Sequence, residues 1–462
     1  MFSTEDTIVA IATPPGRGGI GVVRLSGASS SAIACALTGR TSFEPRHATL
    51  TTICGGDESR IDRTVITFFP APHSYTGDDV VEISAHGSPV VLRAIVDAAI
   101  AKGARLANPG EFTFRAFLNG RIDLVQAEAI GDLVDAVTPL QARVAFDQLD
   151  GTLTARLREM DAALLELIAP LEASLDFPDE GYHFVARADA ERGIAATLAT
   201  LEGLLADARR GRMIREGLTV AIVGRPNAGK SSLFNRLAGA SRAIVTAIPG
   251  TTRDLLTERI DIGGVPFTVV DTAGLRPETH DAIEAEGIAR ARQAADAADV
   301  VLVVVDRSRP LSGEDETLLK ETAERERVVV ASKSDLTAAW DPSMVSATWH
   351  DQRAICRPDP GVIAVSALTD QGIGALREAI VTAAGVEPLR DGAAVANQRH
   401  AALLERARDA LSRAAAGASQ GVPEEFVLSD LHEARACFDE ITGARPQDEV
   451  LALIFERFCI GK

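Results

Sequence analysis

The chain has 462 residues, of which 46% are apolar and 24% charged, so it can bury several cores and wholesale disorder is excluded. Asp and Glu outnumber Lys and Arg by 65 to 47, and the net charge of −18 leaves only local patches for nucleic acid. Five scattered cysteines without a CxxC pair argue against a disulfide framework or a zinc site and indicate a reducing compartment.

The N-terminus has no basic stretch followed by an apolar core, and no apolar run reaches the roughly 18 residues that a membrane span needs. We therefore expect a cytoplasmic protein that does not bind membranes. Residues 1–119 are predicted to form a compact α/β domain, because short strand-like runs and one clear helical stretch alternate with Gly and Pro. The runs lie at 7–13, 19–27, 63–69 and 79–84, and the helical stretch lies at 89–104.

Residues 120–215 and 386–462 carry apolar residues at helical i, i+3, i+4 spacing and are predicted to form the two parts of one helical domain. Residues 216–385 instead hold near-continuous apolar runs, which suit a parallel sheet covered on both faces. The simplest topology is a helical domain interrupted by an inserted α/β domain. The predicted helices are 124–137, 142–175, 188–211, 398–417 and 427–443, and the predicted strands are 218–224, 265–274, 299–306, 327–335 and 361–368.

A phosphate-binding loop gives the strongest functional signal. Residues 224–231 read GRPNAGKS, which matches GxxxxGK[ST], and they lie between a predicted strand and a predicted helix. Glycines let backbone N–H groups converge on phosphate oxygens, and the helix N-terminus adds positive potential. We expect Lys230 to reach the β- and γ-phosphates and Ser231 to bind Mg²⁺.

Four more motifs follow in the order expected of a GTP-binding domain of the Ras type. PGTTRD at 249–254 supplies Thr252 as a second Mg²⁺ ligand. DTAG at 271–274 can contact the γ-phosphate through the Gly274 N–H, and SKSD at 332–335 can bind guanine through the Asp335 carboxylate. The SAL motif at 366–368 can offer a backbone N–H to guanine. The predicted GTP-binding residues are Asn227, Ala228, Gly229, Lys230, Ser231, Ser232, Thr246, Ala247, Ile248, Pro249, Gly250, Thr251, Thr252, Asp271, Thr272, Ala273, Gly274, Ser332, Lys333, Asp335, Ser366, Ala367 and Leu368.

Two positions depart from the usual pattern. The guanine motif normally begins with Asn, and Ser332 stands there, so we expect weaker nucleotide affinity with guanine preference retained by Asp335. Leu275 follows DTAG where Ras-like enzymes place a water-orienting Gln, so another residue must assist hydrolysis. The acidic candidates just downstream are Glu278, Asp281, Glu284 and Glu286.

The inserted GTPase motifs, the helical halves and the C-terminal FCIGK at 458–462 together resemble the tRNA-modifying GTPase family known as MnmE or TrmE. The likeness extends over the whole chain. N-terminal landmarks lie at 6–8, 19–27, 75–79, 86–87, 109–113, 115–120 and 126–130. The resemblance implies an N-terminal folate-binding domain through which the protein forms a homodimer. It also implies an FAD- and NADH-dependent partner, joined in a heterotetramer, with which the wobble uridine of certain tRNAs is modified at C5.

The resemblance further implies cofactor and catalytic residues. Potassium activates the paired GTPase domains of this family, and its matching ligands are Asn227, Thr246, Ile248 and Thr251. The catalytic acid falls on Glu284, although one extra residue before Gly287 leaves Glu286 and Asp281 open.

A tetrahydrofolate such as 5-formyltetrahydrofolate is the implied one-carbon donor. Its matching residues are Arg24, Glu82, Arg121, where Lys is usual, and Lys462. Cys459 is either a thiol near the modification site or a small buried hydrophobe.

Two other classes of GTPase fit the sequence less well. A ribosome-assembly GTPase should carry a basic RNA-binding module, and neither flank of the GTPase motifs is basic. A self-assembling mechanical scaffold would favour long heptad helices or a membrane patch, and the sequence shows neither.

Overall fold

The computed structural model describes residues 5–55, 59–176, 186–239, 256–271, 293–341, 361–385, 395–445, 448–456 and 458–461. They fall into two compact units, each described here by itself. One comprises residues 1–131, 148–193 and 409–462, and the other comprises residues 132–147 and 194–408. Among the described residues, no helix is both long and apolar enough to cross a membrane. The division into four domain segments stays a prediction.

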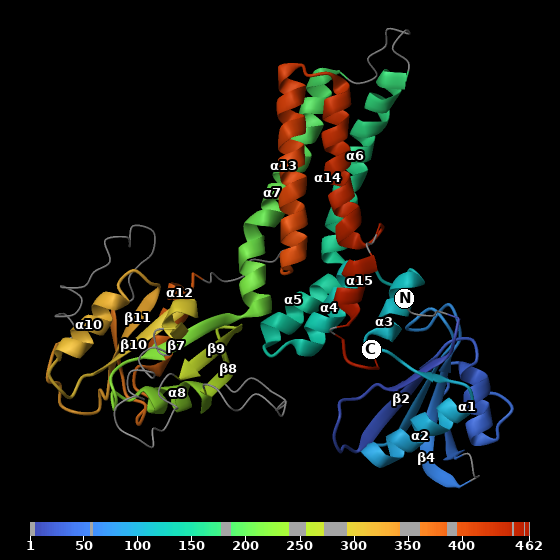
Figure 1. Ribbon diagram of the computed structural model, residues 1–462, viewed down its shortest axis with the longest axis horizontal. Coiled ribbons are helices and arrows are strands. Elements are labelled where there is room, and N and C mark those ends of the chain that lie inside the picture. The colour runs from blue at the N-terminus through green and yellow to red at the C-terminus, as the bar shows by residue number, and fades with distance from the viewer. Residues whose placement is uncertain are drawn as a thin grey trace. The chain divides into compact units, whose positions relative to one another are not determined.

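The N-terminal part of the first unit is a six-stranded mixed sheet of order β3-β4-β5-β2-β1-β6. Helices α1 and α2 cover one face (Figure 1). Alternate residues of the strands, among them Val23, Leu25 and Ile83, pack against these helices and are almost fully buried. The elements are β1 (Ile8–Ile11), β2 (Ile20–Ser26), α1 (Ser30–Thr38), β3 (Thr49–Cys54), β4 (Arg60–Phe69), β5 (Val80–His86), α2 (Pro89–Ala101), β6 (Arg105–Leu106) and α3 (Glu111–Leu118).

The opposite face of this sheet presents the residues that alternate with the core. Arg24 of β2 is paired in register with Ala10 of β1 and with Glu82 of β5. Ile8, Ala10 and Phe112 of α3 form a small apolar cluster on that side. The strand pleat therefore places Arg24 and Glu82 side by side on the face away from α1 and α2.

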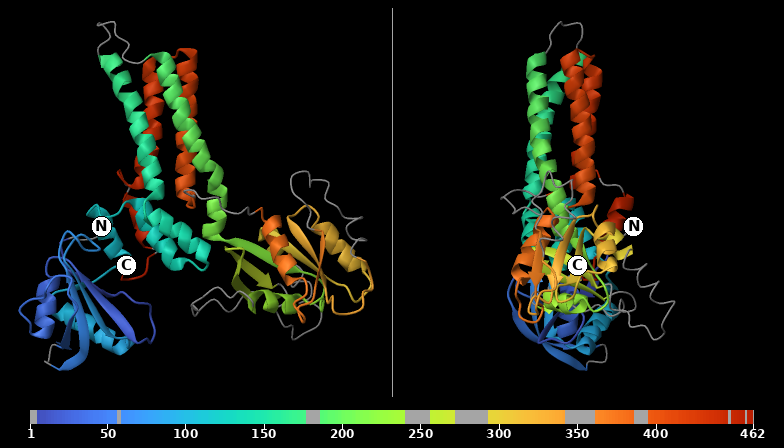
Figure 2. Two further views of the ribbon diagram at one scale, coloured as in Figure 1. Left: turned by 180° about the vertical axis from the view of Figure 1, so that it is seen from behind. Right: turned by 90° about the vertical axis from the view of Figure 1, so that its left-hand side faces the viewer.

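Long helices follow in the middle and at the end of the chain. The predicted stretch 142–175 is two helices, because Gly151 adopts a left-handed backbone conformation (φ +89°) and ends the first. Helices α6 and α14 pack side by side, as the left view of Figure 2 shows. The helices are α4 (Leu124–Asp135), α5 (Pro139–Leu149), α6 (Thr152–Asp176), α7 (Arg187–Glu216), α13 (Gln398–Gln420), α14 (Glu424–Thr442) and α15 (Asp448–Phe455).

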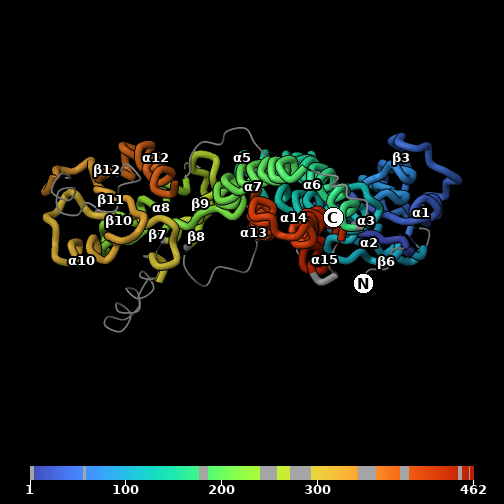
Figure 3. Tube along the Cα trace, turned by 90° about the horizontal axis from the view of Figure 1, so that it is seen from above, coloured from blue at the N-terminus to red at the C-terminus, as the bar shows by residue number. Residues whose placement is uncertain are grey.

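The second unit is built around a six-stranded sheet of order β12-β11-β10-β7-β9-β8, in which only β8 runs antiparallel to its neighbour. Helices α8 and α12 pack on one face and α10 on the other, and Figure 3 shows α10 and α12 on opposite sides of β10 and β11. The elements are β7 (Leu218–Val223), α8 (Lys230–Gly239), β8 (Leu256–Ile262), β9 (Val265–Asp271), β10 (Val300–Asp306), α10 (Gly313–Glu321), β11 (Arg327–Ser332), β12 (Val362–Val365) and α12 (Ile373–Ala383).

The register of this sheet brings the predicted motifs to one edge. The last residues of β10, β11 and β12 are paired with one another, with Asp306 opposite Ser332 and Ser332 opposite Val365. Backbone pairing of Asp271 with Ile222 sets the end of β9 beside the end of β7. Ligands of open parallel sheets bind outside the carboxyl ends of the strands, so this edge is the expected nucleotide site.

Candidate functional site

The phosphate loop joins β7 to α8 and turns tightly. A Cβ on Gly224 would lie 2.4 Å from the carbonyl oxygen of Val304, so only glycine lets the loop pass this close to β10. Gly229 and the non-glycine Asn227 both have positive φ, +98° and +62°. This local geometry, predicted from the motif, leads the chain into the N-terminus of α8.

Lys230 is the first residue of α8 and is almost fully buried. Its Nζ donates hydrogen bonds of 2.7 Å to the Gly224 carbonyl and 2.8 Å to the Arg225 carbonyl, so the loop curls around the ammonium group. A buried cation beside a helix N-terminus favours an anionic ligand. Lys230 therefore lies where a nucleotide phosphate would bind, and its role in holding the β- and γ-phosphates stays a prediction.

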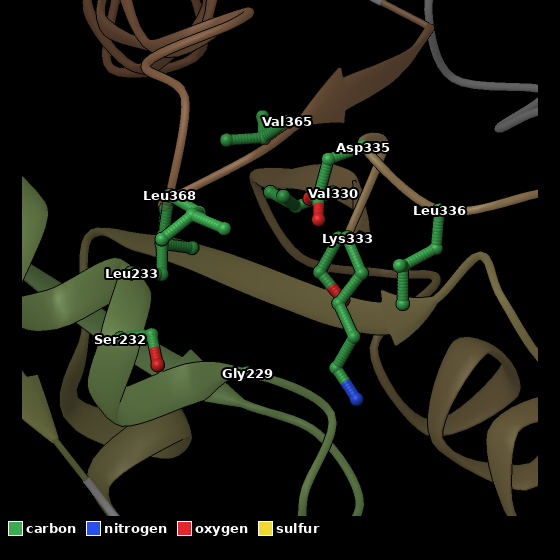
Figure 4. Close-up of a pocket in the computed structure, with 11 residues that line it drawn as sticks. Gly229, Ser232, Leu233, Val330, Lys333, Asp335, Leu336, Val365 and Leu368 are labelled. Atoms are coloured by element: carbon green, nitrogen blue, oxygen red, sulfur yellow. The ribbon is translucent and has the colours of Figure 1, made fainter.

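A pocket of about 140 Å³ opens between the phosphate loop and the ends of β11 and β12. Figure 4 shows Leu336 and Leu368 on opposite sides of it, and both leucines are largely exposed. An exposed apolar pair flanking a pocket is typical of a site for a flat ring. The lining residues are Gly229, Ser232, Leu233, Val330, Ser332, Lys333, Asp335, Leu336, Val365, Ala367 and Leu368.

The SAL loop is held in shape by a buried serine. Ser366 is fully buried, and its hydroxyl accepts hydrogen bonds from the backbone N–H groups of Leu368 (3.3 Å) and Thr369 (3.2 Å). This arrangement fixes the loop that lines the pocket together with Asp335. The structure therefore brings the predicted phosphate loop, SKSD and SAL motifs to one pocket.

Asp306, at the end of β10, was not predicted to belong to the site. Its carboxylate accepts a 2.7 Å hydrogen bond from Lys333 Nζ and further bonds from the backbone and hydroxyl of Ser308. Burial pushes the pKa of Asp306 upward, but the hydrogen bonds from Lys333 and Ser308 outweigh it and the pKa lies below its usual range. The only sequence signal was an acidic residue closing a continuous apolar strand.

Several predicted residues lie outside the described residues, and for Asp271 only the backbone is described. Their roles therefore stay predictions, including most of the potassium set and the catalytic acid. These residues are Thr246, Ala247, Ile248, Pro249, Gly250, Thr251, Thr252, Thr272, Ala273, Gly274, Glu284 and Lys462, together with the alternatives Glu278, Asp281 and Glu286.

A second polar site lies on the open face of the N-terminal sheet. The Nε and Nη2 atoms of Arg24 donate hydrogen bonds of 3.0 and 2.8 Å to Oε1 of Glu82. The Arg24 guanidinium also lies 4.9 Å from the ring centre of Tyr75 and 5.8 Å from that of Phe112. Burial raises the pKa of Tyr75, whose hydroxyl hydrogen-bonds Thr113 at 2.8 Å.

The C-terminal tail is docked on the same part of the unit. Ile460 forms a β-bridge with Pro109. A Cβ on Gly461 would lie 2.3 Å from the carbonyl oxygen of Ile11, at the end of β1 and next to Ala10, the register partner of Arg24. Lys462 follows directly in the sequence but is not among the described residues.

The other two predicted residues of this region differ in their surroundings. Arg121 is exposed and lies against the 75–79 loop, where its Cγ would be 3.3 Å from a Cβ on Gly77. Cys459 is exposed with a free thiol, so the interpretation as a buried hydrophobe is wrong. Its backbone carbonyl accepts a hydrogen bond from the Gly110 N–H at 3.4 Å.

Comparison with known families agrees with this arrangement. Residues 7–121 match the model of the GTP-binding protein TrmE N-terminus, and residues 124–459 match that of the MnmE helical domain. The tRNA modification GTPase MnmE of Koribacter versatilis (strain Ellin345) is 46% identical over 468 residues, covering 100% of both chains. The chain belongs to the MnmE family. Membership and the converging motifs identify a GTP hydrolase.

A second MnmE relative, the tRNA modification GTPase of Laribacter hongkongensis (strain HLHK9), is 44% identical over 464 residues and also covers 100% of both chains. Among solved structures, the G domain of the T. maritima FeoB iron transporter covers 36% of this chain and 98% of its own, at 27% identity and a TM-score of 0.27. This structural likeness is weak, and the fold of this MnmE member is assigned from its own strand order and motifs.

Proposed function

We propose that this protein uses GTP hydrolysis to drive modification of tRNA. One observation carries the nucleotide part: the phosphate loop, the SKSD motif and the SAL motif meet around one pocket at the carboxyl ends of parallel strands. The buried ammonium of Lys230 would hold the β- and γ-phosphates, and the Asp335 carboxylate would accept the N–H groups of guanine. Both of the relatives described above are called tRNA modification GTPases.

Magnesium and potassium would complete the nucleotide site. Mg²⁺ would be held by Ser231 and Thr252, and K⁺ by Asn227, Thr246, Ile248 and Thr251. A monovalent cation beside the phosphates supplies positive charge where negative charge develops. Glu284, in the segment that follows DTAG, is the proposed catalytic acid. Pairing of two GTPase domains would close the site.

The N-terminal face would bind the one-carbon donor, a tetrahydrofolate such as 5-formyltetrahydrofolate. The Glu82 carboxylate can accept two hydrogen bonds from an aminopyrimidine edge, and its contact with the planar guanidinium of Arg24, which donates two bonds to Oε1, supports this role. The docked tail adjoining Arg24 supports a role for Lys462, with Arg121 on the acidic end of the ligand.

The complete reaction requires partners. We propose that the protein forms a homodimer and joins an FAD- and NADH-dependent subunit in a heterotetramer. Together they would install a carboxymethylaminomethyl-type group at C5 of the wobble uridine of certain tRNAs in the cytoplasm. Cys459, exposed on the docked tail, would lie near the modification site.

Turnover of GTP in potassium and in sodium tests the GTPase part. We expect much faster release of phosphate in potassium, and equal rates would contradict the proposal. Mass spectrometry of tRNA nucleosides from a deletion strain tests the substrate, since the modified wobble uridine should disappear.

For the folate site, Glu82→Gln should abolish binding of 5-formyltetrahydrofolate in calorimetry. Asp62→Asn on the neighbouring strand β4 should not, because Asp62 bonds His86 instead.

A further inference from the structure

Ser332 makes contacts that differ from those its motif position suggests. It is the last residue of β11 and only 7% exposed. Its Oγ lies 2.5 Å from the Ala228 carbonyl oxygen in the phosphate loop and 3.2 Å from the Val305 carbonyl oxygen on β10. The hydroxyl therefore joins the end of β11 to the loop that precedes α8.

Counting protons decides what this hydroxyl can do for a ligand. A serine hydroxyl donates one hydrogen, and both of its close neighbours, on Ala228 and Val305, are carbonyl oxygens that only accept. A Cβ on Gly229 would be 3.7 Å from the same Oγ, so the hydroxyl lies against the phosphate loop. The one proton is therefore used within the protein, at 2.5 Å from Ala228 O.

Guanine presents two kinds of polar edge to such a pocket. Its N1–H and N2–H₂ groups are donors, which suit the carboxylate of Asp335, whereas O6 and N7 are acceptors and need donors. A side chain at position 332 with a spare N–H, such as Asn, can serve N7, but the hydroxyl of Ser332 has no second proton. Among the other described side chains that line the pocket, the Lys333 ammonium is held at Asp306 by a 2.7 Å hydrogen bond, and Ser232 belongs to the first turn of α8.

We propose that Ser332 acts as a positioning residue for the phosphate loop and gives the base no donor at N7. The pocket then accepts guanine nucleotides whose position 7 cannot accept a hydrogen bond. This proposal rests on the proposed GTP binding and specifies which atoms of the base are recognised.

The test compares equilibrium affinities of the full-length protein for GDP, 7-deaza-GDP and ADP by calorimetry. For the unaltered protein we expect the GDP and 7-deaza-GDP dissociation constants to agree within about twofold. Ser332→Ala should weaken both to the same extent, because it removes the link to the loop and no contact with the base. Ser332→Asn adds an N–H, so 7-deaza-GDP should bind about two- to tenfold more weakly than GDP.

A matched control separates this effect from general destabilisation. Thr322→Ala also removes a buried hydroxyl, which donates a 2.8 Å hydrogen bond to the Leu318 carbonyl at the end of α10, away from the pocket. It should leave all three affinities unchanged.

The outcomes separate the two proposals. An unaltered protein that binds 7-deaza-GDP more than about threefold more weakly than GDP, with the difference lost in Ser332→Ala, would overturn the role of Ser332. Failure to bind GDP, or equal binding of ADP, would instead contradict the proposed GTP binding. If Ser332→Asn does not fold, the unaltered protein and Ser332→Ala still decide the question.

Discussion

The ion pair between Asp306 and Lys333 should set nucleotide affinity although Asp306 does not line the pocket. Lys333 has a left-handed backbone (φ +57°), which costs a non-glycine residue about 1–2 kcal/mol and needs a restraint. The restraint is the 2.7 Å bond from its Nζ to Asp306, whose side chain is 12% exposed against 32% for Lys333. This bond holds Lys333, which lies between Ser332 and Asp335 in the guanine motif.

Asp306→Asn keeps the size of the side chain and removes its charge. A hydrogen bond to a charged group contributes about 1.5–3 kcal/mol, and partial exposure of Lys333 reduces this to about 1 kcal/mol. We therefore expect the dissociation constant for GDP to rise about fivefold. Titration with a fluorescently labelled GDP measures the change directly.

Asp299→Asn is the matched control, because Asp299 immediately precedes β10 at the opposite end of the strand. Its carboxylate accepts a 2.7 Å hydrogen bond from the Thr219 backbone N–H, far along the sheet from the pocket. The control should leave the affinity for GDP unchanged. Equal effects of the two substitutions, or a change of less than twofold in Asp306→Asn, would refute the reasoning.

Three further results are expected in the first unit. Arg115→Met should lower the free energy of unfolding by about 2–3 kcal/mol in denaturant titrations, because Arg115 is 1% exposed and bonds the carboxylates of Asp6 and Glu111. The control Arg93→Met on α2 removes an exposed ion pair and should cost less than about 0.5 kcal/mol. The hydrogen bond from Arg105 is the main cause of the lowered pKa of Asp6. The ionised Asp6 carboxylate therefore stabilises the folded protein above pH 3.8, and this stabilisation is lost as the pH falls below that value. In thermal melts at a series of pH values, Asp6→Asn should reduce the fall of the melting temperature at acid pH. Gly461→Ala should weaken folate binding in calorimetry with little loss of stability, because its Cβ would lie 2.3 Å from Ile11 O and displace the tail; unchanged affinity would contradict this.

The amino-acid sequence alone predicted where the nucleotide site lies, because phosphate and base recognition depend on short contiguous motifs. GRPNAGKS contains the glycines that its turn requires, and the continuous apolar runs around it predicted a parallel sheet. Elements with weaker local signals were missed: α1 and β8 were not predicted, and the break at Gly151 was not recognised in a long helical pattern.

Contacts between residues far apart in the chain were decided by folding. Ser332 meets Ala228 across 104 residues, and its hydroxyl proton is assigned only once both neighbouring carbonyls are in place. Asp306 gains its role because β10 and β11 end in register, and Gly461 contacts Ile11 at the end of β1, a pairing that no local pattern encodes. A motif specifies the backbone of its own turn, whereas the partners of a side chain depend on how strands and helices pack.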